Sequence, residues 1–383
     1  MSHEGGGGRP LSIVMVSAGF WPAIGGAERQ ALELSAALAA RGHRVTVLTR
    51  GVEGLPGSET VRGVHVRRLW APGGALEAPV FLAGVLIWLL LHWVDWDATH
   101  AHLAGSPALA AALAGKMLGR PSLVKLGGGR GIGELAVSSK TGLGRAKLRA
   151  LGLLRPRFLA VVPDLAEEAR AFLGPISIEV LPNGVDTHRF HPAAPEDKRA
   201  LRASLGLKDD ATVFLYTGRL SPEKRLPWFL KLWLEAAGAK ATALLVGDGP
   251  ERKELEEIAG RSSGRVRVLP SREDVGDVYR ASDVFVLPSI SEGLSNALLE
   301  AMSSGLAPLA SRVGGTAETI SDATNGLLFE RDDEEGVRAA VKRFSTEPAL
   351  AARLGAAARA EAEACYSLDR VVARLETLYR GGE

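Results

Sequence analysis

The sequence predicts an α/β fold with two domains, each built on a parallel β-sheet. The chain has 383 residues, enough for two full cores, and 46% of them are hydrophobic. Short apolar strands alternate with helical patterns from Leu11 to about Val180, an order typical of parallel sheets. A second series of the same kind begins near Ala211. These observations together favour two Rossmann-like domains.

The first series opens with a strand–helix–strand unit. Leu11–Val16 has the pattern of a buried strand, Ala27–Ala40 that of its helix, and Val45–Leu48 that of the next strand. The loop 20–26 should therefore lie at the carboxyl edge of the sheet, where open parallel sheets bind ligands. No Gly-x-Gly-x-x-Gly fingerprint follows this strand and no Walker loop occurs, which disfavours dehydrogenases and nucleoside triphosphatases.

Turn-forming residues between Asn183 and Pro195 mark the expected linker between the domains. The last residues have the pattern of an amphipathic helix. The expected organisation is a flexible tail over 1–10, an amino-terminal domain over 11–190, a carboxyl-terminal domain over 191–365 and a closing helix over 366–383.

Composition and charge narrow the class of protein. The single cysteine, Cys365, excludes an intramolecular disulfide and offers no metal cluster, so a reducing cytoplasm is the expected compartment. Residues 1–8 lack the features of a signal peptide. Residues 1–190 carry 20 Lys and Arg against 14 Asp and Glu, whereas the remainder carries 26 against 30. No nucleic-acid-binding module is present, so the basic half suits an anionic acceptor or a membrane surface better than nucleic acid.

Two glutamates, Glu292 and Glu300, flank the predicted start of a helix that follows a buried strand. Ser295 or Asn296 is the expected N-cap, so free backbone N–H groups and the positive end of the helix dipole should favour an anion there. Carboxylates accept hydrogen bonds from vicinal hydroxyls. This arrangement suits a nucleotide sugar, which has a sugar at each end and phosphates between them. The ordinary alternative is two solvated charges on a surface helix.

Two further strand-end loops carry groups that suit phosphate. Arg219 and Lys224 follow the predicted strand Ala211–Tyr216, where cations can meet phosphate. Gly247 and Gly249 follow another buried strand and allow the backbone to approach a ligand closely. Three loops should thus converge at one edge of the second sheet.

Taken in order, these motifs resemble those of the retaining, metal-independent glycosyltransferases of GT-B fold, glycosyl transferases group 1, which include sucrose synthases and bacterial glycolipid mannosyltransferases. The resemblance spans most of the chain. It implies two Rossmann-like domains facing a central cleft, with a last helix that crosses back onto the amino-terminal domain through Val371, Leu375 and Leu378. The motifs that carry it are Gly25-Gly26-Ala27-Glu28, Ala101-His102, Asn183-Gly184-Val185-Asp186, Gly218-Arg219 with Lys224, Gly247-Asp248-Gly249, Ser289-Ile290-Ser291-Glu292 and Glu300-Ala301-Met302.

On this basis we expect His102 to bond the transferred sugar, Glu292 to orient it and Glu300 to hold the ribose. Arg219 and Lys224 should stabilise charge on the leaving diphosphate, so no metal and no cofactor beyond the nucleotide sugar are expected. Further donor contacts, mainly through backbone, are expected from Gly26, Gly218, Gly247, Gly249, Leu269, Pro270, Gly293, Leu294, Ser295 and Asn296.

The expected reaction moves a sugar with retention from a UDP- or GDP-sugar to a glycan or lipid-linked acceptor in cell-envelope polysaccharide or glycolipid synthesis. Front-face substitution is favoured because no obvious second acid accompanies Glu292, as double displacement would need. The alternatives are a nucleotide-sugar epimerase of the same fold, or a non-catalytic sensor. A sensor would not need the leaving-group cations Arg219 and Lys224.

Two features of the amino-terminal half leave alternatives open. His100 and His102 could form a metal pair, but no matching ligand cluster accompanies them, and a structural histidine is the second alternative. The glycine run between Lys125 and Gly133, which contains Arg130, could wrap a phosphate of the acceptor or donor. It could equally be a mobile loop with solvated charges.

Two segments bear on a membrane. Pro79–Val94 has no Asp, Glu, Lys or Arg, but its helix of about 24 Å is shorter than the roughly 30 Å hydrocarbon core. A buried helix is favoured over a monotopic insertion edged by Trp88, Trp93 and Trp96. Residues 135–163 contain no acid and either form a basic amphipathic surface or a solvated helix. Their cations are Lys140, Arg145, Lys147, Arg149, Arg155 and Arg157. We expect weak, salt-sensitive attachment to anionic membranes, at the inner face of the cell membrane.

Overall fold

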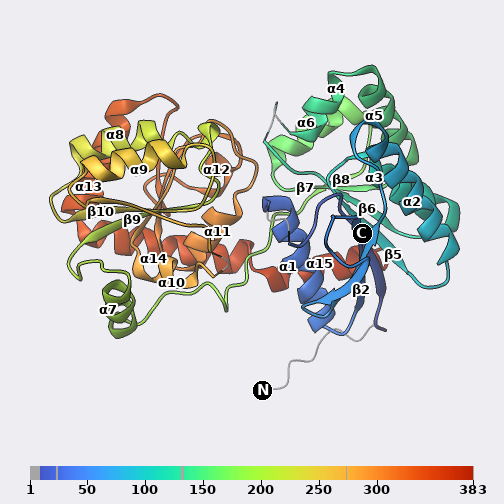
Figure 1. Ribbon diagram of the computed structural model, residues 1–383, viewed down its shortest axis with the longest axis horizontal. Coiled ribbons are helices and arrows are strands. Elements are labelled where there is room, and N and C mark those ends of the chain that lie inside the picture. The colour runs from blue at the N-terminus through green and yellow to red at the C-terminus, as the bar shows by residue number, and fades with distance from the viewer. Residues whose placement is uncertain (1–8, 23–24, 130, 132, 273, 383) are drawn as a thin grey trace. The chain divides into compact units, whose positions relative to one another are not determined.

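The computed structural model describes residues 9–22, 25–129, 131, 133–272 and 274–382 (Figure 1). The chain divides into two compact units: unit 1 comprises Met1–Gly184 and Leu368–Glu383, and unit 2 comprises Val185–Ser367. The first change of unit therefore falls inside the turn-rich stretch that begins at Asn183, ahead of the expected boundary at residue 190. Each unit is an α/β domain around its own sheet.

Within the described residues, the sheet of unit 1 has eight strands in the order β3-β4-β2-β1-β5-β6-β7-β8. Every neighbouring pair is parallel except β3 and β4. The strand order reverses beside β1, and the carboxyl ends of β1 and β5 adjoin at this switch point, where open sheets bind ligands. The strands are β1 Ser12–Val16, β2 Arg44–Arg50, β3 Ser58–Val61, β4 Val64–Leu69, β5 Ala98–His102, β6 Ser122–Lys125, β7 Arg157–Ala160 and β8 Ile178–Val180.

A row of helices covers the sheet of unit 1: α2 packs on α3, α3 on α5, and α5 on α6 (Figure 1). Helix α1, which connects β1 to β2, packs instead on α15, the last helix of the chain. The helices are α1 Gly26–Ala40, α2 Glu77–Leu91, α3 Ser106–Leu118, α4 Glu134–Ser139, α5 Gly142–Leu154, α6 Pro163–Leu173 and α15 Leu368–Tyr379.

Helix α15 is part of the core of unit 1. Val371, Leu375 and Leu378 are buried with side chains of β1, β2 and α1, so the apolar stripe read from the sequence is the packed face. Removing these side chains from water provides most of the attachment, at about 25 cal/mol per Å² of apolar surface.

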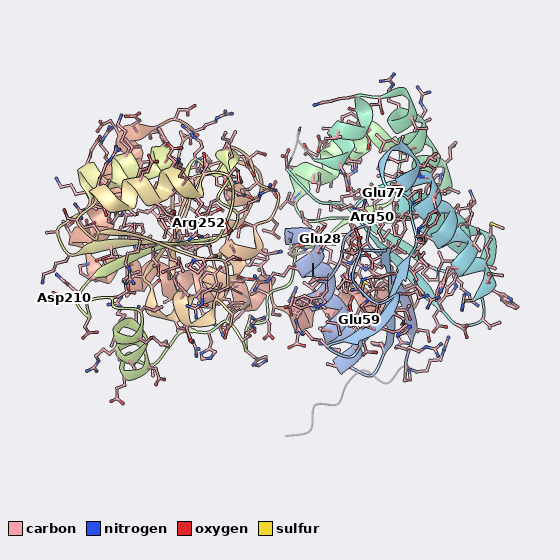
Figure 2. The ribbon with its side chains drawn as sticks, viewed as in Figure 1. Glu28, Arg50, Glu59, Glu77, Asp210 and Arg252 are labelled. Atoms are coloured by element: carbon pink, nitrogen blue, oxygen red, sulfur yellow. The ribbon has the colours of Figure 1, made fainter. Side chains whose placement is uncertain are left out.

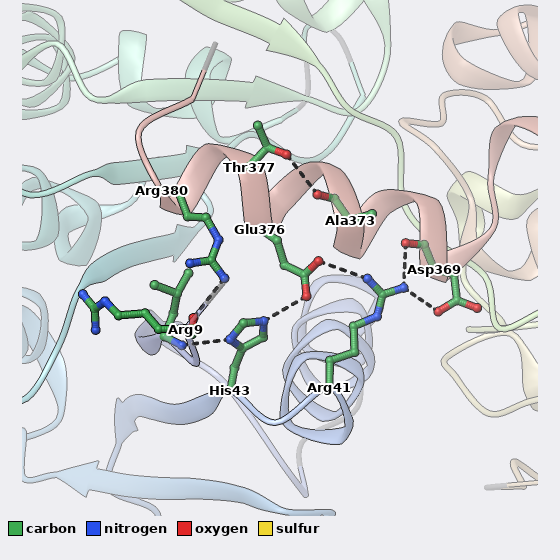
Figure 3. A network of polar contacts seen from close by, with 9 residues as sticks. Arg9, Arg41, His43, Asp369, Ala373, Glu376, Thr377 and Arg380 are labelled. Atoms are coloured by element: carbon green, nitrogen blue, oxygen red, sulfur yellow. Dashed lines mark hydrogen bonds and ion pairs between the residues drawn. The ribbon is translucent and has the colours of Figure 1, made fainter. Parts of the chain in front are cut away.

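Polar contacts fix the orientation of α15 (Figure 3). The Arg41 guanidinium contacts Asp369 at 2.7 Å and Glu376 at 3.2 Å. His43 Nδ1 accepts the Leu11 N–H at 3.0 Å, so its Nε2 carries the proton and donates to Glu376 at 2.9 Å. His43 is buried, and its two ring nitrogens bond Leu11 and Glu376, so it joins the residue before β1 to the last helix.

Helix α2 departs from the sequence expectation. Only Phe81, Val85 and Leu89 are buried, one narrow stripe with a spacing of four residues, and the remaining apolar side chains are partly or fully exposed. A buried helix was therefore the wrong expectation for most of Pro79–Val94. By length and composition, Gly74–Leu91 would suffice to cross a membrane, but α2 packs along α3 within the unit.

Unit 2 contains, within the described residues, a six-stranded parallel sheet in the order β11-β10-β9-β12-β13-β14. Its strands are β9 Thr212–Thr217, β10 Ala241–Val246, β11 Val266–Leu269, β12 Val284–Leu287, β13 Ala307–Ser311 and β14 Leu327–Phe329. Its helices are α7 Pro195–Ser204, α8 Leu226–Ala236, α9 Arg252–Arg261, α10 Gly276–Ala281, α11 Asn296–Ser303, α12 Gly314–Thr319, α13 Glu334–Thr346 and α14 Pro348–Cys365. The order reverses at β9, so the loops after β9, β10 and β12 adjoin.

Candidate active site

The predicted donor residues of unit 2 gather at the carboxyl ends of β10, β9 and β12, which are neighbours in that order. β9 leads into Gly218 and Arg219, β10 into Gly247, and β12 into the loop that contains Glu292. Parallel strands end at one edge of a sheet, so residues distant in sequence become neighbours here. The convergence of three loops expected from the sequence is present.

Backbone packing between the first two loops requires their glycines. A Cβ on Gly247 would overlap the carbonyl oxygen of Gly218, and one on Gly249 would overlap that of Leu220. The Leu220 N–H donates to Asp248 O at 2.8 Å, which holds the loops together. Gly218 and Gly249 have φ of +143° and +155°, where a side chain would be strained. These glycines are thus explained by contact between loops, a reason that the sequence did not suggest.

The central contact of the site joins Lys224 and Glu292. Lys224 Nζ lies 2.6 Å from Glu292 Oε1, and Ser289 Oγ donates to the same oxygen at 2.6 Å. Only 20% of the Lys224 side chain and 10% of the Glu292 side chain are exposed. A charge-assisted contact in such partial burial is stronger than a surface ion pair. The cation expected at the diphosphate and the carboxylate expected at the sugar therefore meet directly.

Arg219 lies on the same loop, is exposed and precedes Lys224 by five residues. The Tyr216 hydroxyl donates to the Arg219 carbonyl at 2.8 Å and fixes the start of the loop. Burial, followed by the negative charges of Glu292, Glu223 and others, raises the pKa of Tyr216 well above its usual value. Tyr216 therefore remains a neutral hydrogen-bond donor that orients the backbone beneath Arg219.

Glu300 lies buried in the second turn of α11. The Tyr279 hydroxyl donates to Glu300 Oε2 at 2.9 Å, and it lies 2.5 Å from Thr217 Oγ1. A phenol has one proton, so Thr217 donates to Tyr279 and Tyr279 donates to Glu300. Tyr279 thereby orients the carboxylate. Tyr279 could not be predicted from the sequence, because α10 carries no local signal that separates it from an ordinary core residue.

The start of α11 has the predicted cap, and the residue is Ser295, whose Oγ accepts the N–H of Leu298 at 3.3 Å. The preceding loop rests on the turn at Gly314 and Gly315, which was not among the predicted site residues. Gly315 N–H donates to Glu292 O at 3.2 Å, and a Cβ on Gly314 or Gly315 would overlap the carbonyl oxygens of Glu292 and Gly293. A signal was present, since two glycines follow β13. Leu294 is buried and Asn296 is partly exposed.

Leu269 and Pro270 lie at the end of β11. The Leu269 carbonyl accepts the Gly247 N–H at 3.2 Å, so this strand end adjoins the β10 loop. Both residues line a hollow of about 600 Å³ together with Ala203–Gly206, Arg267 and Arg272. The carboxyl end of β11 thus borders the glycine loops on one side and a partly basic hollow on the other.

In unit 1, His102 ends β5 and is buried. Its ring stacks on His100 at 4.6 Å, and its Nε2 lies 3.3 Å from Met15 Sδ. Burial and the neighbouring Lys125 lower the pKa of His102 to about 3, so it is neutral near pH 7 and can bond a hydroxyl without acting as an acid. His100 bonds the Tyr379 hydroxyl at 2.6 Å and serves the attachment of α15. Among the described residues, no group of three or more His, Cys, Asp or Glu could hold a metal ion.

Lys125 ends β6 and pairs in register with His102. The expectation of a solvated charge is wrong for Lys125, because it is buried and burial lowers its pKa to about 7. The glycine loop after it folds on itself through Gly133 N–H to Gly129 O at 2.8 Å, and Gly131 N–H donates to Glu168 at 2.9 Å. Arg130, the other predicted phosphate contact, lies outside the described residues.

Glu134, at the start of α4, is a partly buried acid whose two carboxylate oxygens are buried, and no sequence pattern indicated it. Burial raises its pKa to about 7, against the lowering effect of the Ala104 and Gly127 N–H groups and of Lys147. Lys147 is half-buried, its Nζ donates to Ser138 Oγ at 2.7 Å, and burial lowers its pKa. Lys147 was expected on a basic surface, and the structure instead leaves it half-buried against Ser138, where the charge of Glu134 opposes the lowering of its pKa.

Gly26 is the exposed first residue of α1, at the carboxyl edge beside β1. Glu28, in the first turn, folds back so that a Cβ on Gly25 would overlap its carboxylate, and Gly19 adjoins the same side chain. Figure 2 shows Glu28 at this end of α1. The motif Gly25-Gly26-Ala27-Glu28 thus builds a compact helix start in which glycine makes room for the acid.

Comparison with known proteins finds glycosyltransferase matches for both halves of the chain. Residues 24–189 match the model of Glycosyltransferase Family 4, and residues 211–347 that of Glycosyl transferases group 1. A GDP-mannose-dependent monoacylated alpha-(1-6)-phosphatidylinositol monomannoside mannosyltransferase of Corynebacterium glutamicum is 34% identical over 53% of this chain and 56% of its own length. The matches span about half the length of the first curated relatives.

A 2-deoxystreptamine N-acetyl-D-glucosaminyltransferase of Streptomyces fradiae is 31% identical over 93% of this chain and 92% of its own length. Among solved structures, Anabaena HepE in complex with UDP superposes with a TM-score of 0.78 at 19% identity, covering 97% of this chain and 100% of HepE. That similarity concerns the fold. With both halves matched and one relative aligned almost throughout, the chain belongs to the group 1 glycosyltransferases of GT-B fold.

Proposed function

We propose that this glycosyltransferase moves a hexose, with retention and without a metal, from a UDP- or GDP-sugar to a glycan or lipid-linked acceptor. The observation that carries the proposal is the Lys224–Glu292 pair beside the start of α11, with Glu300 one turn into the same helix. A cation, a helix N-terminus and two carboxylates then lie within one loop cluster. This set suits a diphosphate flanked by two hydroxyl-bearing sugars.

The donor diphosphate would bind against Lys224, Arg219 and the first N–H groups of α11. Lys224 would then share its charge between Glu292 and the phosphate, and Glu292 would accept hydroxyls of the transferred sugar. Glu300, oriented by Tyr279 at 2.9 Å, would accept the ribose hydroxyls. Leu269 and Pro270 are proposed for the base, and Gly26 for backbone contact.

Front-face substitution fits the surroundings of Glu292. Lys224 and Ser289, each 2.6 Å from Glu292 Oε1, neutralise and fix this carboxylate, which suits it to orient the sugar rather than to attack the anomeric carbon. In the proposed step the bond from the anomeric carbon to the diphosphate oxygen breaks, and the acceptor oxygen bonds the carbon on the same face. The acceptor proton passes to the leaving diphosphate. Neutral His102 would hydrogen-bond the sugar.

Metal independence rests on the cations of the β9 loop, which would supply the charge that a divalent ion supplies elsewhere.

The sequence Asp95-Trp96-Asp97 has the Asp-x-Asp pattern of a possible metal ligand, but Asp97 serves the fold of unit 1 instead. Asp97 accepts the Ser12 N–H at 2.8 Å and pairs with Arg9 at 2.6 Å, at the amino end of β5 rather than the end that carries His102. These bonds lower the pKa of Asp97 against the opposing effect of burial.

The proposed acceptor is lipid-linked or a glycan of the cell envelope, met in the cytoplasm at the inner face of the membrane. The Corynebacterium relative is named for a phosphatidylinositol mannoside, which supports a lipid acceptor. The basic balance of residues 1–190 supports the same choice.

A thermal-shift panel of UDP-, GDP- and ADP-sugars tests the proposal. A ligand at 100 times its Kd stabilises the folded state by about 2.7 kcal/mol, so the matching donor should raise Tm measurably. Glu300→Gln should lose this shift, and proton NMR of the product should show the anomeric coupling of the donor. If no sugar nucleotide raises Tm, the donor assignment fails, and an inverted anomer would exclude retention.

A further inference from the structure

We propose that the outer surface of α2 and α5 docks onto an anionic lipid bilayer, with α2 lying in the plane of the lipid headgroups. This docking surface belongs to unit 1 alone and shares no residue with the proposed donor site. The docking proposal rests on the proposed function only for the purpose of docking, which is access to a lipid-linked acceptor. Binding to lipid is therefore testable without any turnover.

Helix α2 is apolar on the side that faces solvent. Apart from His92, residues 78–94 contain no polar or charged side chain, although only three residues of the helix are buried. A helix on the surface of a soluble domain normally turns charged residues outward. Here the outer side chains are apolar, and an exposed patch of this kind marks an interaction site. The large exposed ones are Leu76, Ile87, Leu91, Trp93 and Val94.

Contacts hold α2 lengthwise on its unit, so it presents its side to a partner. Glu77 at its start forms an ion pair with Arg50 of β2, and Figure 2 shows the two side by side. Beyond its end, Trp96 Nε1 donates to the Leu89 carbonyl at 3.0 Å. Trp96 is buried and thus is not the interfacial residue that the sequence suggested, whereas Trp93 is 54% exposed. An apolar helix fixed lengthwise along a domain surface lies on a bilayer rather than across it.

The apolar surface continues onto α3 and α5. Lys116 Nζ donates to the Leu153 carbonyl at 3.2 Å, which joins the end of α3 to the end of α5. Met117 lies next to this contact and is 60% exposed, and Leu143 at the start of α5 is 85% exposed. Exposed cations lie on the same helices and at their ends, and residues 135–163 include no acid. The exposed cations are Lys116, Lys140, Arg145, Arg149 and Arg155.

The positive charge of the docking surface favours an anionic bilayer over a second copy of the chain. A second copy placed by two-fold symmetry would bring α5 near the same cations of its partner, which repel. An anionic bilayer accepts the apolar side chains below its headgroups and attracts each cation with about 1 kcal/mol. Tryptophan is enriched at that depth, which suits Trp88 and Trp93. The combination of an apolar helix side and adjacent cations therefore favours lipid.

Vesicle flotation at low and high salt tests the proposal with three variants. Ile87→Glu/Leu91→Glu charges the apolar side, and Lys140→Glu/Arg145→Glu/Arg149→Glu reverses the cations. Lys147 is left intact because it is half-buried and bonds Ser138. Val180→Glu is the control, since Val180 is exposed on β8, which pairs with β7 and packs on α6 of unit 1. All substituted side chains are exposed, so each variant should keep the wild-type Tm.

The wild type and the control should float with vesicles of phosphatidylglycerol and phosphatidylcholine, and only weakly with phosphatidylcholine alone. Each of the other two variants should lose about tenfold or more in bound fraction, and raised salt should reduce wild-type binding as the Debye length shortens. Brominated lipid should quench wild-type tryptophan fluorescence, and less so in Trp93→Phe.

Equal flotation of all four proteins, or no flotation of the wild type, would overturn the proposal. So would a wild-type dimer in light scattering that Ile87→Glu/Leu91→Glu converts to monomer without any wild-type binding to vesicles, because a second copy would then be the occupant. Turnover on a water-soluble acceptor should be unchanged in the α2 variant. A wild type that floats with vesicles but transfers no sugar would count against the proposed function only.

Discussion

Lys224 Nζ lies 2.6 Å from Glu292 Oε1 across 68 residues of sequence, and Ser289 reaches the same oxygen. The pair joins the loop after β9 to the loop after β12, and Ile290 N–H to Glu223 O at 2.8 Å adds a backbone link between them. A change at either residue should therefore affect the other. A shift in the position of Lys224 would change the positive charge available to a bound phosphate.

Lys224→Ala should reduce turnover far more than donor affinity, because negative charge on the diphosphate grows toward the transition state. We expect a rise in the barrier of roughly 2–4 kcal/mol. Steady-state kinetics and calorimetric titration with the donor measure the two effects. Lys231→Ala, an exposed lysine of α8, is the control and should behave as wild type. Weakened binding with normal kcat would reduce Lys224 to an anchor.

Tyr279→Phe should weaken donor binding by about 1 kcal/mol, because Glu300 loses the hydroxyl that orients it. Calorimetry with the nucleotide measures the change. Tyr379→Phe, which removes the hydroxyl bonded to His100, is matched in chemistry and burial and should cost stability without changing donor affinity. If both variants bind the donor like the wild type, Glu300 needs no orientation by Tyr279, and its proposed contact with ribose loses support.

Gly247→Ala should destabilise unit 2 by roughly 2 kcal/mol or more, since its Cβ would overlap the Gly218 carbonyl and force two loops apart. Gly260→Ala in α9, where a Cβ meets nothing within 4 Å, should instead stabilise by about 0.5–1 kcal/mol. Denaturant unfolding compares the two. Equal stability of both variants would mean that the loops separate easily, contrary to the backbone contact described here.

Lys125 should make stability depend on pH. Its ordinary pKa is 10.5 and its folded value is about 7, so between these values the unfolded chain binds more protons and stability rises with pH. Lys125→Met removes this dependence. The unfolding free energy of the wild type minus that of Lys125→Met should increase from pH 7 to pH 10, by up to about 4 kcal/mol. A difference that is flat over this range would indicate that Lys125 stays hydrated.

Excess chelator should leave turnover unchanged, because Arg219 and Lys224 are proposed to neutralise the diphosphate. The assay compares rates with EDTA before and after addition of Mg²⁺ or Mn²⁺. Loss of activity under EDTA followed by recovery with either ion would refute metal-independent transfer.

Local sequence determined much of this architecture. Hydrophobic patterns placed β1, α1 and β2 close to their observed bounds, and Ser295 caps α11, because period and capping depend on neighbouring residues. Glu292, Lys224 and Arg219 could be proposed as a group because strand-end loops of a parallel sheet meet at one edge. That rule needs only the order of the elements.

Tertiary packing decided which residues are buried and which residues contact one another. Tyr279 of α10 orients Glu300 of α11, and Lys147 of α5 bonds Ser138 of α4, through contacts between elements that no local pattern encodes. Lys125 is buried, whereas the apolar α2 is only partly covered, the reverse of what residue polarity suggests. Periodicity shows which residues share a face of an element, but burial depends on whether another element covers that face. For α2 the sequence determined an apolar helix, and the fold left its outer side uncovered.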